Sequence, residues 1–376
     1  MASKIDLAAK SYAARRRLVF NLAGKKEKIG AFAVTSATDV RYLTGMVEGC
    51  PLLLLGKDWE MIFTHSMYRG RPPVECPGCE YRVMEKGLWD EMRDLLKRRR
   101  VKRVGFQKGN VTFAFHEGMS KGLKGVRLIP MDNIVTDARI VKSGEEIRLL
   151  QKATIIAEKA MRGLIKGGAS GLIGRTELEL AAELEQRMRE YGALRQGFPG
   201  GLIVASGPNS ASCHHVPTQR KIKEGDVLLI DWGAELHEGY RSDTTRTMFI
   251  RRAPERLAKI YEIVRAANEA AADKLKPGVT SGAVDLAARG LIDKAGYGKE
   301  FCHGLGHGVG FDIHEAPGLA RGSKARLRKN MIVTIEPGIY FNGEGGVRLE
   351  DMLYITSDGS KNFNSLTKDL KKMILI

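Results

Sequence analysis

Four acidic residues and one histidine in the second half of the chain stand where apolar or glycine-rich stretches end. They are Asp231, Asp243, His307, Glu336 and Glu350. A carboxylate at the end of a buried strand is costly unless a cation or a hydrogen-bond donor compensates its charge, and neighbouring carboxylates also repel one another. If the fold gathers these five side chains, positive charge must lie among them.

The first two acids belong to a segment with the pattern of a β-hairpin. The apolar run 226–232 predicts a strand, residues 239–240 provide turn chemistry, and 244–250 predicts the returning strand. Antiparallel return of the chain brings Asp231 close to Asp243. The hairpin therefore accounts for two of the five side chains.

The types of these side chains indicate which cation they would bind. One imidazole and four carboxylates form a hard, oxygen-rich set that suits divalent ions, and four negative charges balance two such ions. We expect two ions that share carboxylates, with Mn²⁺ favoured and Co²⁺ or Zn²⁺ as alternatives. A water held between two such ions loses a proton near neutral pH and becomes a bridging hydroxide nucleophile. The predicted chemistry is hydrolysis.

Short motifs surround these residues. Thr-Arg-Thr lies just after Asp243, His307 lies in a His-Gly-Leu-Gly-His-Gly frame, Glu336 begins Glu-Pro-Gly, and Glu350 ends Gly-Val-Arg-Leu-Glu. This ordered set resembles the pita-bread metallopeptidases, and within them the Xaa-Pro branch of prolidase and aminopeptidase P. The resemblance covers roughly residues 140–360, with a weaker similarity in the N-terminal third.

The resemblance implies an α+β chain with two domains. We expect a smaller α/β N-terminal domain of the creatinase/prolidase type over residues 1–135 and a pita-bread catalytic domain over 136–376. A pita-bread domain has helix pairs that back a curved sheet. The resemblance also implies a homodimer.

Apolar spacing independently predicts elements of the second domain. Ser143 and Thr176 each precede a glutamate by three residues and so form capping boxes that open helices. Two further helices are predicted over 253–275 and 282–295. Additional strands are predicted at 202–206, 331–335 and 347–355.

The resemblance assigns a role to each metal ligand. Asp243 and Glu350 would bridge the two ions. Asp231 would bind one ion, and His307 with Glu336 would bind the other. Glu336 would also shuttle the proton, since a carboxylate beside the hydroxide can accept it.

Other residues are expected to act on the substrate. His214 matches the histidine that hydrogen-bonds the substrate around the scissile amide, with His215 as the alternative. His314 matches the histidine that stabilises the tetrahedral intermediate. His303 is expected in the pocket wall. Arg348 would contact substrate or orient an acid.

Two departures from the family pattern affect these assignments. Asp231 and Asp243 are twelve residues apart where eleven is usual, so the turn between them must absorb one residue. Side chains alternate along a strand, so a slip in register would turn one acid away from the site. Cys213 stands where many relatives have proline, next to His214.

The leading hypothesis is a dinuclear metallopeptidase that removes a residue before proline or splits Xaa-Pro dipeptides. Proline blocks ordinary peptidases because its amide is tertiary and its ring fixes the backbone. Two alternatives stay open. One is a non-catalytic pita-bread module that binds nucleic acid or protein, and the other is a related hydrolase or lyase without proline specificity.

Composition bears on partners and location. The net charge of +17 could attract nucleic acid, but the basic residues are spread through the chain, which favours a solvated basic surface. No apolar run has the length of a membrane span, and the start lacks a signal-peptide core, so we expect a cytoplasmic protein. Cys76 and Cys79 are expected to form a tight turn rather than a zinc or redox site.

Overall fold

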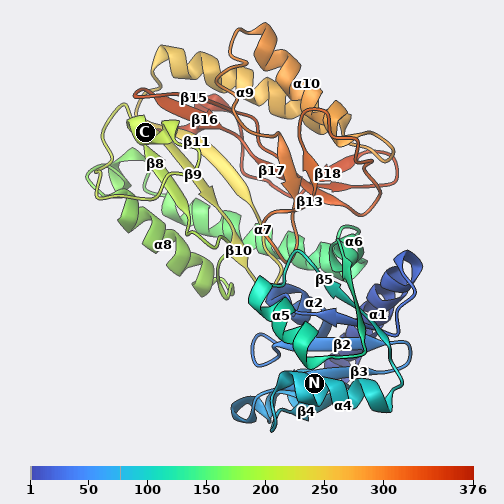
Figure 1. Cartoon of the computed structure of the whole chain (residues 1–376). Helices are drawn as coiled ribbons and strands as arrows, with labels where there is room; N and C mark the ends of the chain where they lie inside the picture. The colour runs from blue at the N-terminus through green and yellow to red at the C-terminus, as the bar shows by residue number, and fades with distance from the viewer. Residues whose placement is uncertain (1, 77) are drawn as a thin grey trace. The chain divides into compact units, whose positions relative to one another are not determined.

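The structure, a computed structural model, describes residues 2–76 and 78–376 and is drawn in Figure 1. It divides into two compact units, residues 1–139 and 140–376. The expected domain boundary at residue 135 falls inside α6 (Ile134–Arg139), which packs against α1 (Ala2–Lys26) of the first unit. Each unit has a buried hydrophobic core of its own.

The first unit is built on a six-stranded mixed sheet. Its strands lie in the order β4-β3-β2-β1-β5-β6, and β1, β5 and β6 are parallel neighbours. The strands are β1 (Ala31–Val34), β2 (Leu52–Gly56), β3 (Glu60–Thr64), β4 (Glu80–Val83), β5 (Arg103–Gln107) and β6 (Arg127–Met131). The remaining helices are α2 (Ala37–Thr44), η1 (Ser66–Tyr68), α3 (Arg71–Glu75), α4 (Leu88–Arg98) and α5 (Phe113–Gly122).

The second unit is an α+β fold in which two helix pairs flank antiparallel strands. Figure 1 shows α7 and α8 on one side of the strands and α9 and α10 on the other. The helices are α7 (Gly144–Leu164), η2 (Ala169–Gly171), α8 (Glu177–Glu190), η3 (Gly207–Ala211), α9 (Glu255–Lys274), α10 (Ser281–Lys294) and α11 (Leu370–Met373). Among the described residues, none of the helices combines the length and apolar character that a bilayer span requires.

The strands of the second unit form four sheets. The larger sheets have the orders β19-β11-β9-β8 and β13-β12-β14-β17-β18, while β15 pairs with β16 and β10 with β7. The strands are β7 (Arg195–Gln196), β8 (Ile203–Ser206), β9 (Val227–Trp232), β10 (Ala234–Glu235), β11 (Thr244–Ile250), β12 (Gly306–Gly308), β13 (Glu315–Leu319), β14 (Ile332–Ile335), β15 (Gly338–Phe341), β16 (Gly345–Arg348), β17 (Asp351–Ile355), β18 (Ser360–Asn362) and β19 (Ile374–Leu375). The α+β class predicted from the sequence is confirmed.

Helices α7 and α8 begin where the sequence predicts. The Ser143 and Thr176 hydroxyls accept hydrogen bonds from the backbone N–H groups of Glu146 and Glu179. Each glutamate carboxylate accepts a hydrogen bond in return from the backbone N–H of its cap. Both capping boxes are therefore complete, which fixes the first turn of each helix.

The five cysteines are of two kinds. Cys76 and Cys79 form the expected turn, in which the backbone N–H of Cys79 donates to the carbonyl oxygen of Cys76 at 3.2 Å. Their sulfurs also form a disulfide, which was not expected. The thiols of Cys50, Cys213 and Cys302 are free, and burial raises the pKa of Cys50 to about 12.

The hairpin of β9 and β11 places Asp231 and Asp243 on one face of its sheet. Asp231 lies opposite Thr245, and the antiparallel pairing continues in register to a bridge between Glu235 and Arg241. Asp243 lies two residues before Thr245 and so shares its face. The turn beyond the bridge accommodates the twelve-residue separation without a slip between the two acids.

Alternation along β9 sends neighbouring side chains to opposite faces. Ile230 and Trp232 are fully buried in the core, and the Trp232 indole donates a hydrogen bond to a carbonyl of α7. Asp231, between them, therefore points away from that core. At Gly233 the two arms of the hairpin come so close that a Cβ would lie 1.7 Å from the carbonyl oxygen of Ser242.

The single strand expected over residues 347–355 is wrong. The chain leaves one sheet there and joins another, because β16 pairs with β15 while β17 pairs with β14. The segment that pairs with them makes the same change of sheet between β14 and β15. Pro337 lies at that point and has no N–H group to continue the hydrogen-bond ladder. Glu336 and Glu350 thus lie at two adjacent crossing points.

We expect Gly233→Ala to lower the free energy of unfolding by about 2 kcal/mol or more, because the added methyl group overlaps the carbonyl oxygen of Ser242. Gly290→Ala in α10 is the matched control, since a Cβ there meets nothing within 4 Å and alanine favours helix. Urea unfolding followed by circular dichroism measures both variants. Equal losses of stability in the two would contradict the close approach.

Candidate metal centre

A cavity of about 550 Å³ in the second unit is lined by every residue proposed for the site from the sequence. These residues are His214, Asp231, Asp243, His303, His307, His314, Glu336, Arg348 and Glu350. The fold thus collects side chains from loops and strand ends that are far apart in the sequence. Apolar residues, among them Phe198, Val216 and Ile313, also line the wall.

Three of the proposed ligands form a compact group. Asp243, His307 and Glu350 each offer a ligand atom, and these atoms all lie within 4.8 Å of one another. His307 Nε2 lies 3.6 Å from Asp243 Oδ2 and 3.3 Å from Glu336 Oε1. Two atoms that each bind one ion at about 2.1 Å can be at most about 4.2 Å apart. Both separations therefore suit a shared ion.

The buried acids lack sufficient compensation from the chain. Asp231 Oδ1 and Glu350 Oε1 are buried and accept no hydrogen bond from the described residues. Burial and then the charge of neighbouring carboxylates raise the pKa of Asp243 and that of Glu350 well above their usual values. Burial also raises the pKa of Asp231. Buried carboxylate oxygens without a hydrogen-bond donor require a cation nearby. The carboxylates and the histidine of this cluster are therefore suitable ligands for divalent metal.

His307 and Glu336 form a charged pair within the cluster. Burial alone would lower the pKa of His307, but its hydrogen bond and charge interaction with Glu336, together with the charge of Asp243, raise it to about 9. Burial alone would raise the pKa of Glu336, but His307 lowers it to about 2. At neutral pH without metal, the imidazolium of His307 therefore supplies part of the missing positive charge.

Arg348 orients one of the acids. Its guanidinium is buried, and its Nη2 lies 2.7 Å from Asp231 Oδ2. Its Nε donates to the Thr245 hydroxyl at 3.0 Å, and that hydroxyl lies 2.7 Å from Glu350 Oε2. Arg348 and Thr245 thus connect Asp231 to Glu350. Direct contact of Arg348 with substrate stays a prediction.

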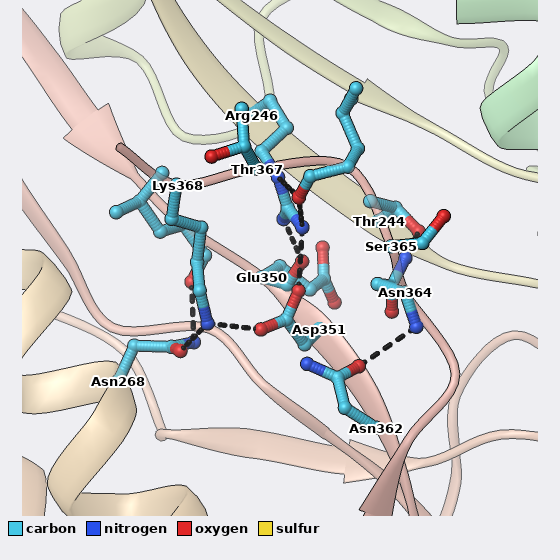
Figure 2. A network of polar contacts seen from close by, with 12 residues as sticks. Thr244, Arg246, Asn268, Glu350, Asp351, Asn362, Asn364, Ser365, Thr367 and Lys368 are labelled. Carbon is cyan, nitrogen blue, oxygen red and sulfur yellow. Dashed lines mark hydrogen bonds and ion pairs between the residues drawn. The ribbon is translucent and has the colours of Figure 1, made fainter. Parts of the chain in front are cut away.

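Figure 2 shows a buried polar network beside Glu350. Arg246, which is 1% exposed, donates from Nη1 to the carbonyl oxygen of Glu350 at 2.6 Å and from Nη2 to Asp351 Oδ1 at 2.7 Å. Lys368 pairs with the other oxygen of Asp351. The two cations hold Asp351, while the side chain of the neighbouring Glu350 lines the cavity.

Asn268 of α9 fixes both crossing points at once. Its Nδ2 donates to the carbonyl oxygen of Ile335 at 2.8 Å and to that of Leu349 at 3.1 Å. These residues immediately precede Glu336 and Glu350. One buried amide therefore positions the backbone that carries two proposed ligands.

Glu177, the first residue of α8, holds the segment that carries His214. Its fully buried carboxylate accepts hydrogen bonds from the backbone N–H groups of Ser206 (2.8 Å) and Thr218 (3.0 Å) and lies 2.9 Å from His215 Nε2. Burial alone would raise the pKa of Glu177, but hydrogen bonds from His215 and nearby polar side chains lower it to about 2. His215 is engaged with Glu177, whereas His214 is an exposed residue of the cavity wall.

The other two histidines differ in their surroundings. His314 packs edge-on against the ring of His307, with centroids 4.3 Å apart. Burial and then the charge of His307 lower the pKa of His314, which favours its neutral form. His303 Nε2 lies 3.0 Å from Tyr340 Oη, and burial lowers the pKa of this histidine as well.

Three supporting residues were not predicted from the sequence. The capping box of Thr176 marks the start of α8, but nothing in that motif indicates the partners of Glu177. Asn268 lies on the otherwise apolar buried face of α9. A single amide on such a face is the sequence feature that could have indicated its supporting role. A supporting role for Asp351 could have been inferred from its position next to Glu350. Adjacent residues of an extended segment point to opposite sides, so Asp351 needs partners of its own away from the metal ligands.

Comparison with known proteins decides the family. Residues 148–357 match Metallopeptidase family M24, and residues 20–141 match the Creatinase/Prolidase N-terminal domain. The chain belongs to metallopeptidase family M24. Membership implies divalent metal at the carboxylate and histidine cluster described above.

Individual M24 relatives resemble the chain over nearly its whole length. The Xaa-Pro dipeptidase of Pyrococcus horikoshii is 34% identical over 348 residues, which is 92% of this chain and 95% of that protein. The solved Xaa-Pro dipeptidase from Bacillus anthracis has a TM-score of 0.88 at 33% identity and covers 96% of this chain and 99% of its own. The X-Pro aminopeptidase from Thermotoga maritima has a TM-score of 0.83 at 29% identity, with coverage of 92% and 98%. The predicted resemblance and fold are confirmed.

We expect divalent ions to raise the Tm of this M24 chain after metal removal, and Glu350→Gln to abolish that rise. In the ion-free protein the substitution should instead raise Tm by about 2 °C or more, because it removes a buried carboxyl group whose ionised form three neighbouring carboxylates repel. Calorimetry with and without Mn²⁺ measures both effects. Glu269→Gln, an exposed site on α9, is the matched control and should change neither. A full ion-dependent rise in Glu350→Gln would refute the ligand assignment.

The hydrogen bonds to Glu177 predict a pH-dependent contribution to stability. Its pKa is about 2 in the folded protein against 4.5 for a free glutamate, so the stabilisation is complete above about pH 4.5 and is lost as the pH falls towards 2. We expect Glu177→Gln to lower the free energy of unfolding by up to about 3 kcal/mol at pH 7, and by less at pH 3. Urea titrations at both pH values, with the exposed Glu190→Gln as control, test this. A difference that is the same at both pH values would exclude the carboxylate as its source.

Proposed function

We propose that the chain hydrolyses the bond before proline, in Xaa-Pro dipeptides or at the N-termini of longer peptides, using two divalent ions with Mn²⁺ as the first choice. One observation carries this proposal: a cluster of four acids and a histidine leaves two buried carboxylate oxygens without a donor in a cavity of about 550 Å³. That volume suits a small peptide. The names of the relatives, Xaa-Pro dipeptidase and X-Pro aminopeptidase, support proline specificity.

The proposed ligand roles follow the charges of the cluster. We assign Asp243 and Glu350 to both ions, Asp231 to one, and His307 with Glu336 to the other. The raised pKa values of Asp243 and Glu350 support this, since each of these acids faces several other carboxylates. When bound, the ions supply Lewis acidity for the scissile carbonyl and activate a water.

The remaining chemistry falls to side chains. Glu336, which lines the cavity beside His307, offers a carboxylate that can accept a proton from the attacking water. His314, which packs against His307 in the cavity wall, can donate a hydrogen bond to the developing oxyanion. His214 is available to bind the substrate around the scissile amide, while His215 is held by Glu177.

The cavity wall accounts for the proposed substrate preference. Phe198, Val216 and Ile313 provide apolar surface that suits the pyrrolidine ring. We place His303 in the wall beside the substrate, and Arg348 where it orients Asp231. We assign catalysis to the domain 136–376 and treat the homodimer as a further proposal, which sedimentation analysis checks.

Chelation should lower the hydrolysis of Xaa-Pro dipeptides by more than about 100-fold, and added Mn²⁺ should restore it, because the ions supply the activated water. Co²⁺ and Zn²⁺ are added in parallel to rank the metals. Xaa-Ala dipeptides of equal length should be poorer substrates by about tenfold or more, and longer Xaa-Pro peptides show the length preference.

Two outcomes would contradict this function. Equal turnover of Xaa-Pro and Xaa-Ala substrates would remove the proline specificity. Ion binding without turnover, together with salt-sensitive nucleic-acid binding, would favour the non-catalytic module instead.

A further inference from the structure

Two basic segments of the first unit lead into its sheet at the same edge. Residues 97–103 and 121–127 together carry nine lysines and arginines and no acidic residue. The first segment runs from the end of α4 into β5, and the second runs from the end of α5 into β6. Strands β5 and β6 are parallel neighbours, and Arg103 lies opposite Arg127. Because parallel strands that pair in this way begin at the same edge, the fold joins two basic segments that the sequence separates.

Backbone and ring contacts hold the two segments together. The backbone N–H of Arg127 donates to the carbonyl oxygen of Lys102 at 2.8 Å, just outside the paired strands. The preceding helices also pack on each other, since the rings of Trp89 in α4 and Phe115 in α5 meet edge to face with centroids 4.8 Å apart. The position of the basic side chains is therefore set by the fold of the first unit and does not depend on their own charges.

Six of the nine cations are not compensated by the protein. The other three form ion pairs, which are Arg99 with Glu80 at 3.0 Å, Arg103 with Glu27 at 3.3 Å and Lys121 with Glu117 at 2.9 Å. Within residues 2–76 and 78–376, none of the remaining six side chains makes an ion pair or a hydrogen bond, and all six are exposed. They are Lys97, Arg98, Arg100, Lys102, Lys124 and Arg127. Six positive charges thus face solvent from two adjoining segments.

The apolar side chains of these segments do not add to the exposed surface. Val101 and Leu123 are buried, and Val126 is half-buried. A protein interface usually has an apolar core, and stable attachment to a membrane needs an apolar anchor besides basic side chains. A nucleic acid needs neither, because its phosphates bind cations and release counterions into solution. A charged surface without exposed apolar groups therefore favours nucleic acid as the partner.

We propose that residues 97–103 and 121–127 form a surface that binds the phosphate backbone of nucleic acid without reading its sequence. The six exposed cations contact phosphate oxygens, and each arginine can donate two parallel hydrogen bonds to one phosphate. Such contacts position a nucleic acid but carry no sequence information. The surface belongs to the first unit and the metal centre to the second, so this binding does not depend on the proposed peptidase function.

Fluorescence anisotropy tests the binding. A labelled DNA duplex of about 20 base pairs is titrated with the ion-loaded full chain, and a single-stranded RNA of the same length is titrated in parallel to show which nucleic acid is preferred. About six phosphate contacts predict a slope of about −5 for the logarithm of the DNA binding constant against that of the salt concentration. Affinity should therefore fall about 100-fold or more between about 50 and about 200 mM salt. Failure of both probes to bind at the lower salt concentration would overturn the proposal.

Two variants with the same change of charge locate the surface. The first replaces five of the six exposed cations: Lys97→Gln, Arg98→Gln, Lys102→Gln, Lys124→Gln and Arg127→Gln. The matched control replaces five exposed lysines of the second unit: Lys166→Gln, Lys276→Gln, Lys294→Gln, Lys299→Gln and Lys361→Gln. The first variant should lose affinity about 30-fold or more at low salt together with most of its salt dependence, while the control should lose about threefold or less. Equal losses would show that net charge alone attracts nucleic acid and would overturn the surface.

Smaller variants and a membrane probe complete the test. Circular dichroism checks that the variants are folded. If the first variant is not, the pair Lys97→Gln with Arg98→Gln and the pair Lys124→Gln with Arg127→Gln are measured separately, and each should reduce the salt slope by about 2. An unchanged slope in both pairs would contradict the proposal. Vesicles that contain phosphatidylserine are the membrane probe, and binding to them without binding to nucleic acid would assign the surface to a membrane instead.

Discussion

The balance of charge among buried carboxylates constrains the whole second unit. Asp243 and Glu350 lie where water cannot solvate them, and burial followed by the charge of neighbouring carboxylates raises the pKa of each. The chain compensates only in part, with the guanidinium of Arg348 on Asp231 and an imidazolium at His307. A metal-binding imidazole must be neutral, so an incoming ion displaces the proton of His307. Metal and protons therefore compete for the site, and acid should favour release of the ion.

Such repulsion requires a rigid frame. Asn268 fixes the backbone before both glutamates, and Arg246 with Lys368 holds Asp351 on the opposite side of the chain. The two contacts of Asn268 go to main-chain carbonyl oxygens, whereas Asp351 is held through its side chain. The frame thus keeps the acids together even without metal, at a cost in stability that the ion offsets.

Much of this arrangement could be predicted from the sequence, because several signals are local. The hairpin of Asp231 and Asp243 follows from strand and turn residues, and the capping boxes of α7 and α8 follow from short motifs. The division of residues 347–355 into two strands could not be predicted, since strand-forming residues lie on both sides of the break and the contact of Asn268 at that break comes from a distant helix. Glu177 was missed for the same reason, because its partners lie in a loop that its own neighbourhood does not indicate.

The order in which the ligands are synthesised has a consequence for how the site matures. The hairpin of Asp231 and Asp243 leaves the ribosome well before the segments of His307, Glu336 and Glu350. Until those arrive, the two aspartates have neither Arg348 nor a complete set of partners, so burying the hairpin is unfavourable. Loading with metal is accordingly a late event of biogenesis, and a nascent chain that stalls before residue 350 carries only an incomplete metal site.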